Sequence, residues 1–126
     1  MLSRIFFVLC ISLILLSCSS KKDTLIYKPS EKVDPYMLYQ EGLNAFEEND
    51  YFYSSKKFSE AELNFDIPRL AAKSSIMASY SLYGINFYED AEENLKRYLQ
   101  TYPADKFVIY AHYLLAIIYF EQIGEE

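Results

Sequence analysis

The sequence predicts an all-α protein built as a solenoid of antiparallel helix pairs, and three observations lead to this prediction. Apolar residues recur at the three-to-four spacing of helices along residues 34–122, and no stretch alternates as a strand would. Short breaks rich in Asn, Asp, Pro and Gly divide this region into five segments. Small residues also recur at a spacing of 37, at Gly42, Ser79 and Ala116. A period of roughly 20–50 residues is typical of repeat proteins, which build extended concave surfaces.

The first helix pair is expected within residues 34–67. Asp34 can cap a helix, and Pro35 suits the first helical position because its missing N–H costs nothing there. We therefore expect a helix from Pro35 to about residue 48, ended by the Asn-Asp pair at 49–50. A second helix is expected over about 51–65, followed by a turn at Asp66-Ile67-Pro68.

The second pair is expected within residues 68–105, with helices over about 69–83 and 86–101. Asn86 followed by Glu89 is typical of a capping box at the start of the later helix. A third unit, residues 106–126, contains one further helix over about 106–122, for which Asp105 is the expected cap. The solenoid is thus predicted to be truncated within its third repeat.

Residues 1–17 have the features of an export signal. A basic start at Arg4 precedes an apolar run, Ile5–Leu16, that is shorter than the roughly 20 residues of a membrane-spanning helix. The run ends Leu15-Leu16-Ser17-Cys18, which resembles the lipobox of bacterial lipoproteins. That resemblance implies cleavage before Cys18 and lipidation of its sulfur and new N-terminus; the alternative is an ordinary signal peptide with a chance cysteine. In such lipoproteins Ser19 after the cysteine points to the outer membrane. Residues 18–33 are then expected to form a flexible tether.

Composition narrows the possible functions. The chain carries a net charge of −6, which argues against nucleic acid as a partner. Besides Cys18 the chain has one other cysteine, Cys10, which lies in the apolar run and would be removed with it. Since Cys18 would be lipidated, the mature chain is expected to hold no free thiol, disulfide or Cys-based metal site. His112 is the single histidine, and no carboxylate pair or Ser/His arrangement suggests catalysis, so we expect no enzyme activity, no cofactor and no metal. The other interpretation of His112 is packing between helices.

The repeats resemble the tetratricopeptide repeat. Gly42, Ser79 and Ala116 take the eighth place of that repeat, where paired helices approach closely. Tyr98 departs from the usual Ala of the twenty-seventh place, and Glu41 from the usual Leu at the seventh. Other residues also match the tetratricopeptide pattern. In the first repeat they are Ala45, Tyr51, Ser54, Phe58 and Ala61, and in the second they are Leu82, Tyr88, Ala91, Leu95 and Pro103.

Together with the lipobox and tether, residues 36–123 resemble the BamD family, the lipoproteins of the outer-membrane β-barrel assembly machine. The most specific stretch is Tyr110-Ala111-His112-Tyr113-Leu114-Leu115-Ala116 with Ile117-Ile118-Tyr119-Phe120 after it, and Arg97-Tyr98-Leu99 with Tyr102-Pro103 adds support. The resemblance implies a lipid-anchored scaffold at the periplasmic face of the outer membrane. It also implies contacts with unfolded barrel substrates through the early repeats, and with BamA and BamC through later ones. The family has about five repeats, so the residues that dock to BamA and BamC are expected to lie outside this sequence. The last helix is expected to expose Leu114, Leu115, Ile118 and Tyr119.

The first helix of each tetratricopeptide pair lines the concave face. The places that point into it are mostly aromatic here, and rigid rings with polar tips are good anchors for a peptide. The predicted groove residues are Tyr36, Tyr39, Leu43, Phe46, Lys73, Ile76, Tyr80, Tyr83, Tyr110, Tyr113, Ile117 and Phe120. Lys73 is the best-placed cation for a terminal carboxylate, ahead of Arg69 and Lys106. For any single ring, above all Phe46, Tyr83 and Phe120, packing between repeats is the alternative.

Two functions therefore remain open. The first is binding of unfolded barrel substrates in outer-membrane protein assembly. The second is a different tetratricopeptide lipoprotein of the cell envelope, which coordinates cell-wall synthesis or division. The acidic residues Asp90, Glu92 and Glu93 either form a solvated face or contact a partner at its rim.

Overall fold

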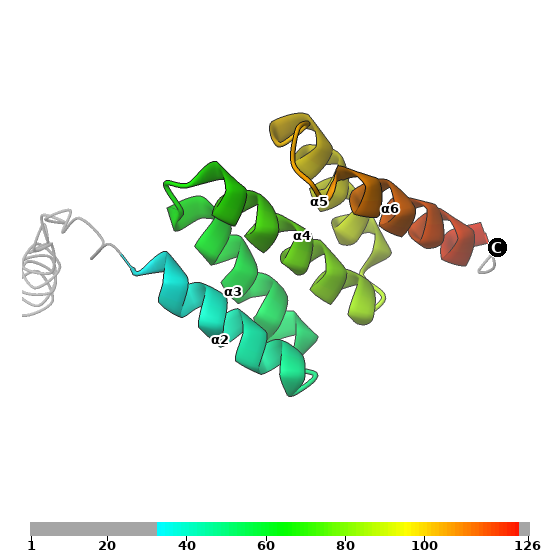
Figure 1. Ribbon diagram of the computed structural model, residues 1–126. Coiled ribbons are helices and arrows are strands. Elements are labelled where there is room, and N and C mark those ends of the chain that lie inside the picture. The colour runs from blue at the N-terminus through cyan, green and yellow to red at the C-terminus, as the bar shows by residue number, and fades with distance from the viewer. Residues whose placement is uncertain (1–32, 124–126) are drawn as a thin grey trace, which may run out of the picture.

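The computed structural model describes residues 33–123, which form five α-helices and, within that range, no strand (Figure 1). The predicted signal peptide, Cys18 and tether lie outside the described residues. The helices are α2 (Pro35–Glu47), α3 (Tyr51–Asn64), α4 (Pro68–Gly84), α5 (Tyr88–Thr101) and α6 (Val108–Ile123). The prediction of an all-α chain is confirmed.

Successive helices run antiparallel and stack into an array, with α2, α3 and α4 side by side and α5 and α6 beyond them (Figure 1). α4 lies at the centre, because it packs on α3 on one side and on α5 on the other, while α6 packs on α5 and touches α4. The first helix of each unit, α2, α4 and α6, thus alternates with the second helices α3 and α5. This is the tetratricopeptide-like arrangement that the 37-residue spacing predicts.

Most helix ends agree with the sequence. The Asp34 carboxylate accepts the N–H of Tyr36 at 3.0 Å, and the Asp50 carboxylate accepts the N–H of Tyr53 at 3.1 Å. Each carboxylate satisfies a donor that the first helical turn leaves without a partner. Pro68 is the first residue of α4 rather than part of the preceding turn, as suits a residue without an N–H.

Two expected helix starts are wrong. Asn86 has φ 61°, a left-handed conformation, so it cannot act as the N-cap of a capping box. The N-cap is Phe87, and the side chain of Asn86 instead accepts the hydroxyl of Tyr88 at 3.1 Å. Helix α6 begins at Val108, two residues after the expected start, because Asp105 accepts the N–H of Phe107 and holds a turn there.

Small side chains allow the helices to approach one another. Ser74, Ser75, Ser79 and Ser81 of α4 are buried, and Ser81 meets the hydroxyl of Ser54 on α3 at 3.0 Å. Among the described residues no buried side-chain nitrogen or oxygen lacks a hydrogen bond. The serines therefore contribute close contact without the cost of an unpaired buried hydroxyl.

Tyr98, the residue that departs from the tetratricopeptide pattern, is fully buried in α5. Its hydroxyl donates to the Asp105 carboxylate at 2.6 Å, so the larger side chain joins α5 to the turn that leads into α6. Glu41, the other departure, lies near the surface of α2 and forms an ion pair with Lys57 at 3.0 Å.

Helix α6 exposes a different face from the one expected. Leu114, Leu115 and Ile118 are buried in a cluster with α4 and α5, so their predicted exposure is wrong. Tyr119 is 42% exposed, and its hydroxyl donates to Glu92 at 3.1 Å. The side chains that face outward include Ile109, Tyr113, Phe120 and Ile123. Ala116 is exposed too, since none of the described helices covers it. No helix within residues 33–123 is both long and apolar enough to cross a membrane.

Candidate peptide-binding face

A row of aromatic rings joins the three first helices α2, α4 and α6. Tyr80 of α4 lies at its centre, with its ring centroid 5.6 Å from that of Phe46, 6.3 Å from that of Tyr83 and 6.3 Å from that of Tyr110. Tyr110 continues to Tyr113 at 6.5 Å. These five rings, which we call the aromatic face, therefore form a contiguous surface contributed by both complete repeats and by α6.

The rings of this face remain open to solvent to different degrees. Tyr113 is 62% exposed, Tyr80 38% and Tyr110 37%, whereas Phe46 and Tyr83 are half-buried. Burial, followed by the nearby Tyr80, Tyr113 and Tyr83, raises the pKa of Tyr110, so its hydroxyl stays neutral at physiological pH. A neutral hydroxyl above an apolar ring can donate and accept hydrogen bonds while the ring binds apolar groups.

A second group of predicted residues lies at the other end of α4. The ammonium of Lys73 is 4.9 Å from the ring centroid of Tyr39, and that ring packs on Phe58 at 5.2 Å. Lys73 is exposed, so its charge remains available to an anionic group beside an aromatic surface.

Other predicted groove residues have different surroundings. Tyr36 is 56% exposed and packs its ring edge-on against Phe65, at 5.1 Å, rather than against the aromatic face. Leu43 and Ile117 are half-buried, and Phe120 is 75% exposed near the end of α6. Ile76 is buried in the core with α5 and α6, so the prediction that it lines the groove is wrong.

The weaker cation candidates lie at a separate hollow. Arg69 and Lys106 line a surface cavity of about 520 Å³ between the start of α4 and the α5–α6 connection, together with Ala72, Pro103 and Asp105. The ammonium of Lys106 is 4.7 Å from the ring centroid of Phe107. His112 is exposed on α6, so it does not pack between helices as the alternative interpretation supposed. Within residues 33–123 no three His, Cys, Asp or Glu side chains come close enough to hold a metal ion.

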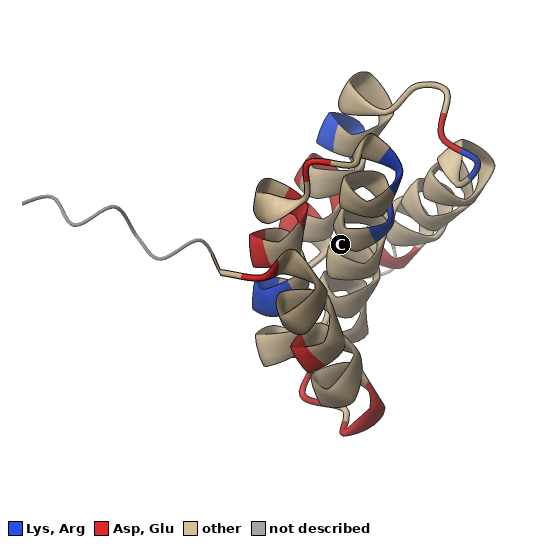
Figure 2. Cartoon of the chain, turned by 60° about the vertical axis from the view of Figure 1, so that its left-hand side comes forward, with Lys and Arg blue, Asp and Glu red and all other residues tan. Residues whose placement is uncertain are grey.

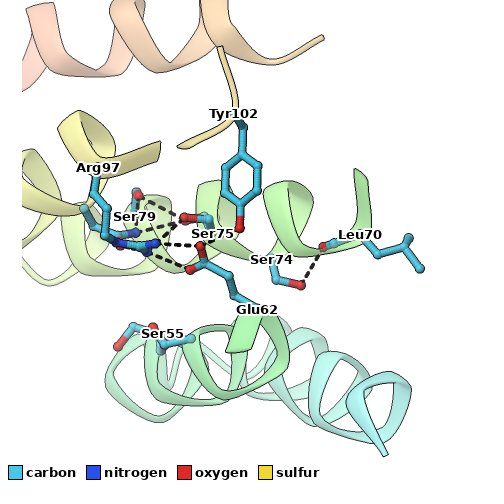
Figure 3. A network of polar contacts seen from close by, with 10 residues as sticks. Ser55, Glu62, Leu70, Ser74, Ser75, Ser79, Arg97 and Tyr102 are labelled. Atoms are coloured by element: carbon cyan, nitrogen blue, oxygen red, sulfur yellow. Dashed lines mark hydrogen bonds and ion pairs between the residues drawn. The ribbon is translucent and has the colours of Figure 1, made fainter. Parts of the chain in front are cut away.

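A polar network that joins α3, α4 and α5 was not predicted (Figure 3). The buried carboxylate of Glu62 on α3 accepts one N–H from each terminal nitrogen of Arg97 on α5, both at 2.7 Å. It also accepts the hydroxyl of Tyr102 at 3.0 Å. Arg97 continues to Ser75 and Asn94, and Asn94 donates to Ser79 at 2.7 Å.

This network holds the relative position of the two helix pairs, because it connects α3, α4 and α5. A bidentate pair between Arg and a carboxylate fixes geometry as well as distance. Glu62 and Arg97 are 35 residues apart, and neither position is set by the 37-residue spacing. The apolar position of Glu62 in its helix, one residue after the buried Ala61, was the available signal that its carboxylate needed a partner.

Antiparallel helix pairs and small residues at a constant spacing together define a tetratricopeptide-like helical scaffold, and one side of it carries the contiguous aromatic face. Residues 31–126 match the YfiO family, which is described as outer membrane lipoprotein. The chain belongs to this family.

Two curated relatives are similar to most of this chain. Outer membrane protein assembly factor BamD of Rickettsia prowazekii (strain Madrid E) is 29% identical over 119 residues, which cover 94% of this chain and 45% of the relative. Outer membrane protein assembly factor BamD of Caulobacter vibrioides (strain ATCC 19089 / CIP 103742 / CB 15) is 32% identical over 104 residues, covering 82% of this chain and 33% of the relative. The chain thus spans less than half the length of either relative. No solved structure matches it significantly.

Proposed function

We propose that this chain is a lipid-anchored, non-enzymatic binding component of outer-membrane β-barrel protein assembly, held through Cys18 at the periplasmic face of the outer membrane. Membership of an outer membrane lipoprotein family and two relatives named as assembly factors support the general role. Its partners in this proposal are BamA, other assembly components and unfolded outer-membrane proteins.

The aromatic face is the observation that carries the substrate part of the proposal. Strands of membrane-spanning β-barrels alternate apolar and polar residues and are flanked by aromatic residues at both interfaces. Before folding, such a segment is an extended chain that offers an apolar side chain at every second position. Five contiguous rings across α2, α4 and α6 can receive several of these side chains, while tyrosine hydroxyls can hydrogen-bond the exposed backbone.

Lys73 gives the proposed surface a preferred direction. It lies in the first half of α4 with its ammonium over the ring of Tyr39, whereas Tyr80, at the centre of the aromatic face, lies in the second half of that helix. A terminal carboxylate beside Lys73 would leave the preceding side chains to run along α4 toward Tyr80. We therefore propose that segments ending in an aromatic residue bind in this orientation.

Peptide binding tests this proposal. A labelled peptide from a barrel terminus that ends in Phe should bind the chain, and Tyr39→Ala and Tyr80→Ala should each weaken binding roughly tenfold, the effect of losing an aromatic anchor. Tyr53→Ala is the matched control, because Tyr53 is 42% exposed on α3 outside this face. Replacing the terminal Phe by Ala, or the carboxylate by an amide, should weaken binding to the unmutated chain. Equal affinity of Tyr39→Ala, Tyr80→Ala and the unmutated chain would show that the substrate assignment is wrong.

The anchor and the assembly role need separate tests. Cys18→Ala should move the chain from the membrane fraction to the soluble fraction after cell lysis. Purification of the unmutated chain from membranes should recover barrel-assembly components. Recovery of cell-wall synthesis or division enzymes without those components would favour the alternative function of an envelope lipoprotein of that kind.

A further inference from the structure

A crevice between α3 and α5 is the second surface of this molecule that is suited to binding. We propose that it binds a segment of a partner protein in which Lys or Arg alternates with bulky apolar residues. The crevice has a volume of about 500 Å³ and is lined by Phe52 of α3, Leu82 of α4, and Phe87, Asp90, Glu93 and Arg97 from the start of α5 onward. The aromatic face is built from the first helices of the repeats, α2, α4 and α6. The crevice is lined mainly by the second helices, α3 and α5.

Two exposed phenylalanines form the apolar part of the crevice. Phe52 is 63% exposed and Phe87 45%, and their rings meet edge-on with centroids 6.4 Å apart. The 37-residue spacing places Phe52 opposite Glu89 and Phe87 opposite Asp50 in the other repeat. Since the equivalent positions are acidic, packing of the helix pairs does not require phenylalanine at either place.

Carboxylates form the polar wall. Asp90 and Glu93 are exposed, one helical turn apart on α5, and neither has an ion-pair partner among residues 33–123. The cation at this wall, Arg97, already forms a bidentate ion pair with Glu62 through its two terminal nitrogens. The negative charge of Asp90 lies in the first turn of α5, where it interacts favourably with the helix dipole. Glu93 lies beyond that turn, where this stabilising interaction is weaker.

Charge complementarity identifies the occupant. Among the described residues that line the crevice, two carboxylates have no ion-pair partner and the one cation is paired, so an acidic or neutral segment would gain nothing from this wall. A Lys or Arg ammonium or guanidinium could pair with Asp90 or Glu93, while the next apolar side chain packs on the two phenylalanine rings. The two ends of the helix array differ in charge: in Figure 2 acidic residues colour the end where α2 passes into α3, and blue segments lie mostly toward the opposite end.

The experiment uses a labelled peptide of about ten residues in which Lys alternates with Leu, titrated with the full chain. Phe52→Ala should weaken binding roughly tenfold, as expected for an aromatic anchor, and the double variant Asp90→Asn/Glu93→Gln should weaken it roughly fivefold at low salt. Leu63→Ala is the control for Phe52, because Leu63 is 83% exposed on the same helix. Glu47→Gln/Glu48→Gln removes two charges elsewhere and controls for net charge. Both controls should stay within about twofold of the unmutated chain.

Several results would overturn the proposal. Equal loss in the charge control and in Asp90→Asn/Glu93→Gln would show unspecific attraction to an acidic protein. Loss of binding in Tyr80→Ala but not in Phe52→Ala would assign the peptide to the aromatic face. Dissociation of a dimer by Phe52→Ala, with no competition from the peptide, would make a second copy of the chain the occupant. Because Tyr39→Ala and Tyr80→Ala should leave this peptide's affinity unchanged, failure here is distinct from failure of the proposed function.

Discussion

Gly42 determines how closely α2 and α3 approach each other. A Cβ added at this position would lie 2.8 Å from Cδ1 of Phe58, whose side chain is fully buried. Phe58 cannot move away without disturbing the core, because protein interiors are close-packed.

We expect Gly42→Ala to lower the free energy of unfolding by about 1–3 kcal/mol, the usual cost of overpacking a core. The loss should occur even though Ala favours a helix interior over Gly by about 1 kcal/mol. Urea unfolding monitored by circular dichroism measures it. Gly84→Ala is the control: its added Cβ would lie 3.2 Å from the half-buried ring of Tyr51, a looser contact that should cost less stability than the one at Gly42. A Gly42→Ala variant as stable as the unmutated chain would contradict this description of the contact.

Single residues also show where sequence reasoning succeeds and fails. The Asp34 cap and the close approach at Gly42 follow from local chemistry, and both predictions agree with the structure. Asn86 was misinterpreted because its side chain suits both a cap and a left-handed turn. The repeat spacing held the missing signal, since Asn49 lies 37 residues earlier and has the same φ of 61°.

At the scale of elements, the Glu62–Arg97 ion pair connects the second helices of the two repeats. The side chain of Glu62 is 5% exposed and that of Arg97 is 46% exposed. Removal of Arg97 would therefore leave a nearly buried carboxylate, with Tyr102 as its remaining described hydrogen-bond partner. Breaking such a pair costs more than the pair itself contributes, because the remaining charge is poorly solvated.

We expect Arg97→Ala to destabilise the chain by about 1–3 kcal/mol, toward the low end of buried pairs since water reaches the guanidinium. The adjacent Lys96 provides the control. It pairs with Glu92 on the same helix, and Lys96 is 54% exposed, so Lys96→Ala should leave the stability close to that of the unmutated chain. Thermal unfolding of both variants compares them directly, and equal effects would show that the ion pair does not join the helices.

Helix α6 explains why the exposed face of an element can be mispredicted. Its sequence is apolar almost all round, so periodicity predicts a helix but does not indicate which side is buried. The contacts with α4 and α5 decide this, and they bury Leu114 and Ile118 while Tyr113 and Phe120 face outward. The bounds of the helix can be predicted from the local sequence alone. The side that is buried can be predicted only from the tertiary arrangement.

At the scale of the whole molecule, two tyrosines link stability to alkaline pH. Burial, then the charge and hydrogen bond of Glu62, raises the pKa of Tyr102 to about 12. Burial, then the hydrogen bond to Asp105, raises the pKa of Tyr98 as well. The unfolded chain releases these protons near pH 10, so the folded chain holds them more tightly.

Stability should therefore be unaffected by these groups below about pH 10 and should fall as pH rises toward about 12, by up to about 1.4 kcal/mol per pH unit for each tyrosine. Urea unfolding at a series of pH values measures the slope. Tyr102→Phe should lower stability at neutral pH, because Glu62 loses a hydrogen bond. The same variant should show a smaller fall of the free energy of unfolding as pH rises from about 10 to about 12. A stability that stays constant or rises over this interval would contradict the structure.

The arrangement of the candidate site was predictable only in part. The repeat register brought Phe46, Tyr80 and Tyr110 to one side, because they take the twelfth, ninth and second places of their repeats, and all three places face the concave side. Burial of Ile76 and the Glu62–Arg97 contact depend on residues far apart in sequence that meet only in the folded chain, so no local pattern reveals them.

In the function we propose, unfolded outer-membrane proteins contact the aromatic face. Site-specific photocrosslinking in the full chain tests it most directly, with Tyr113→p-benzoylphenylalanine on the face and Leu63→p-benzoylphenylalanine as control, since both positions are exposed, at 62% and 83%. We expect adducts with unfolded barrel proteins from position 113 and few from position 63. Equal adducts from both positions, or adducts from position 63 alone, would contradict it.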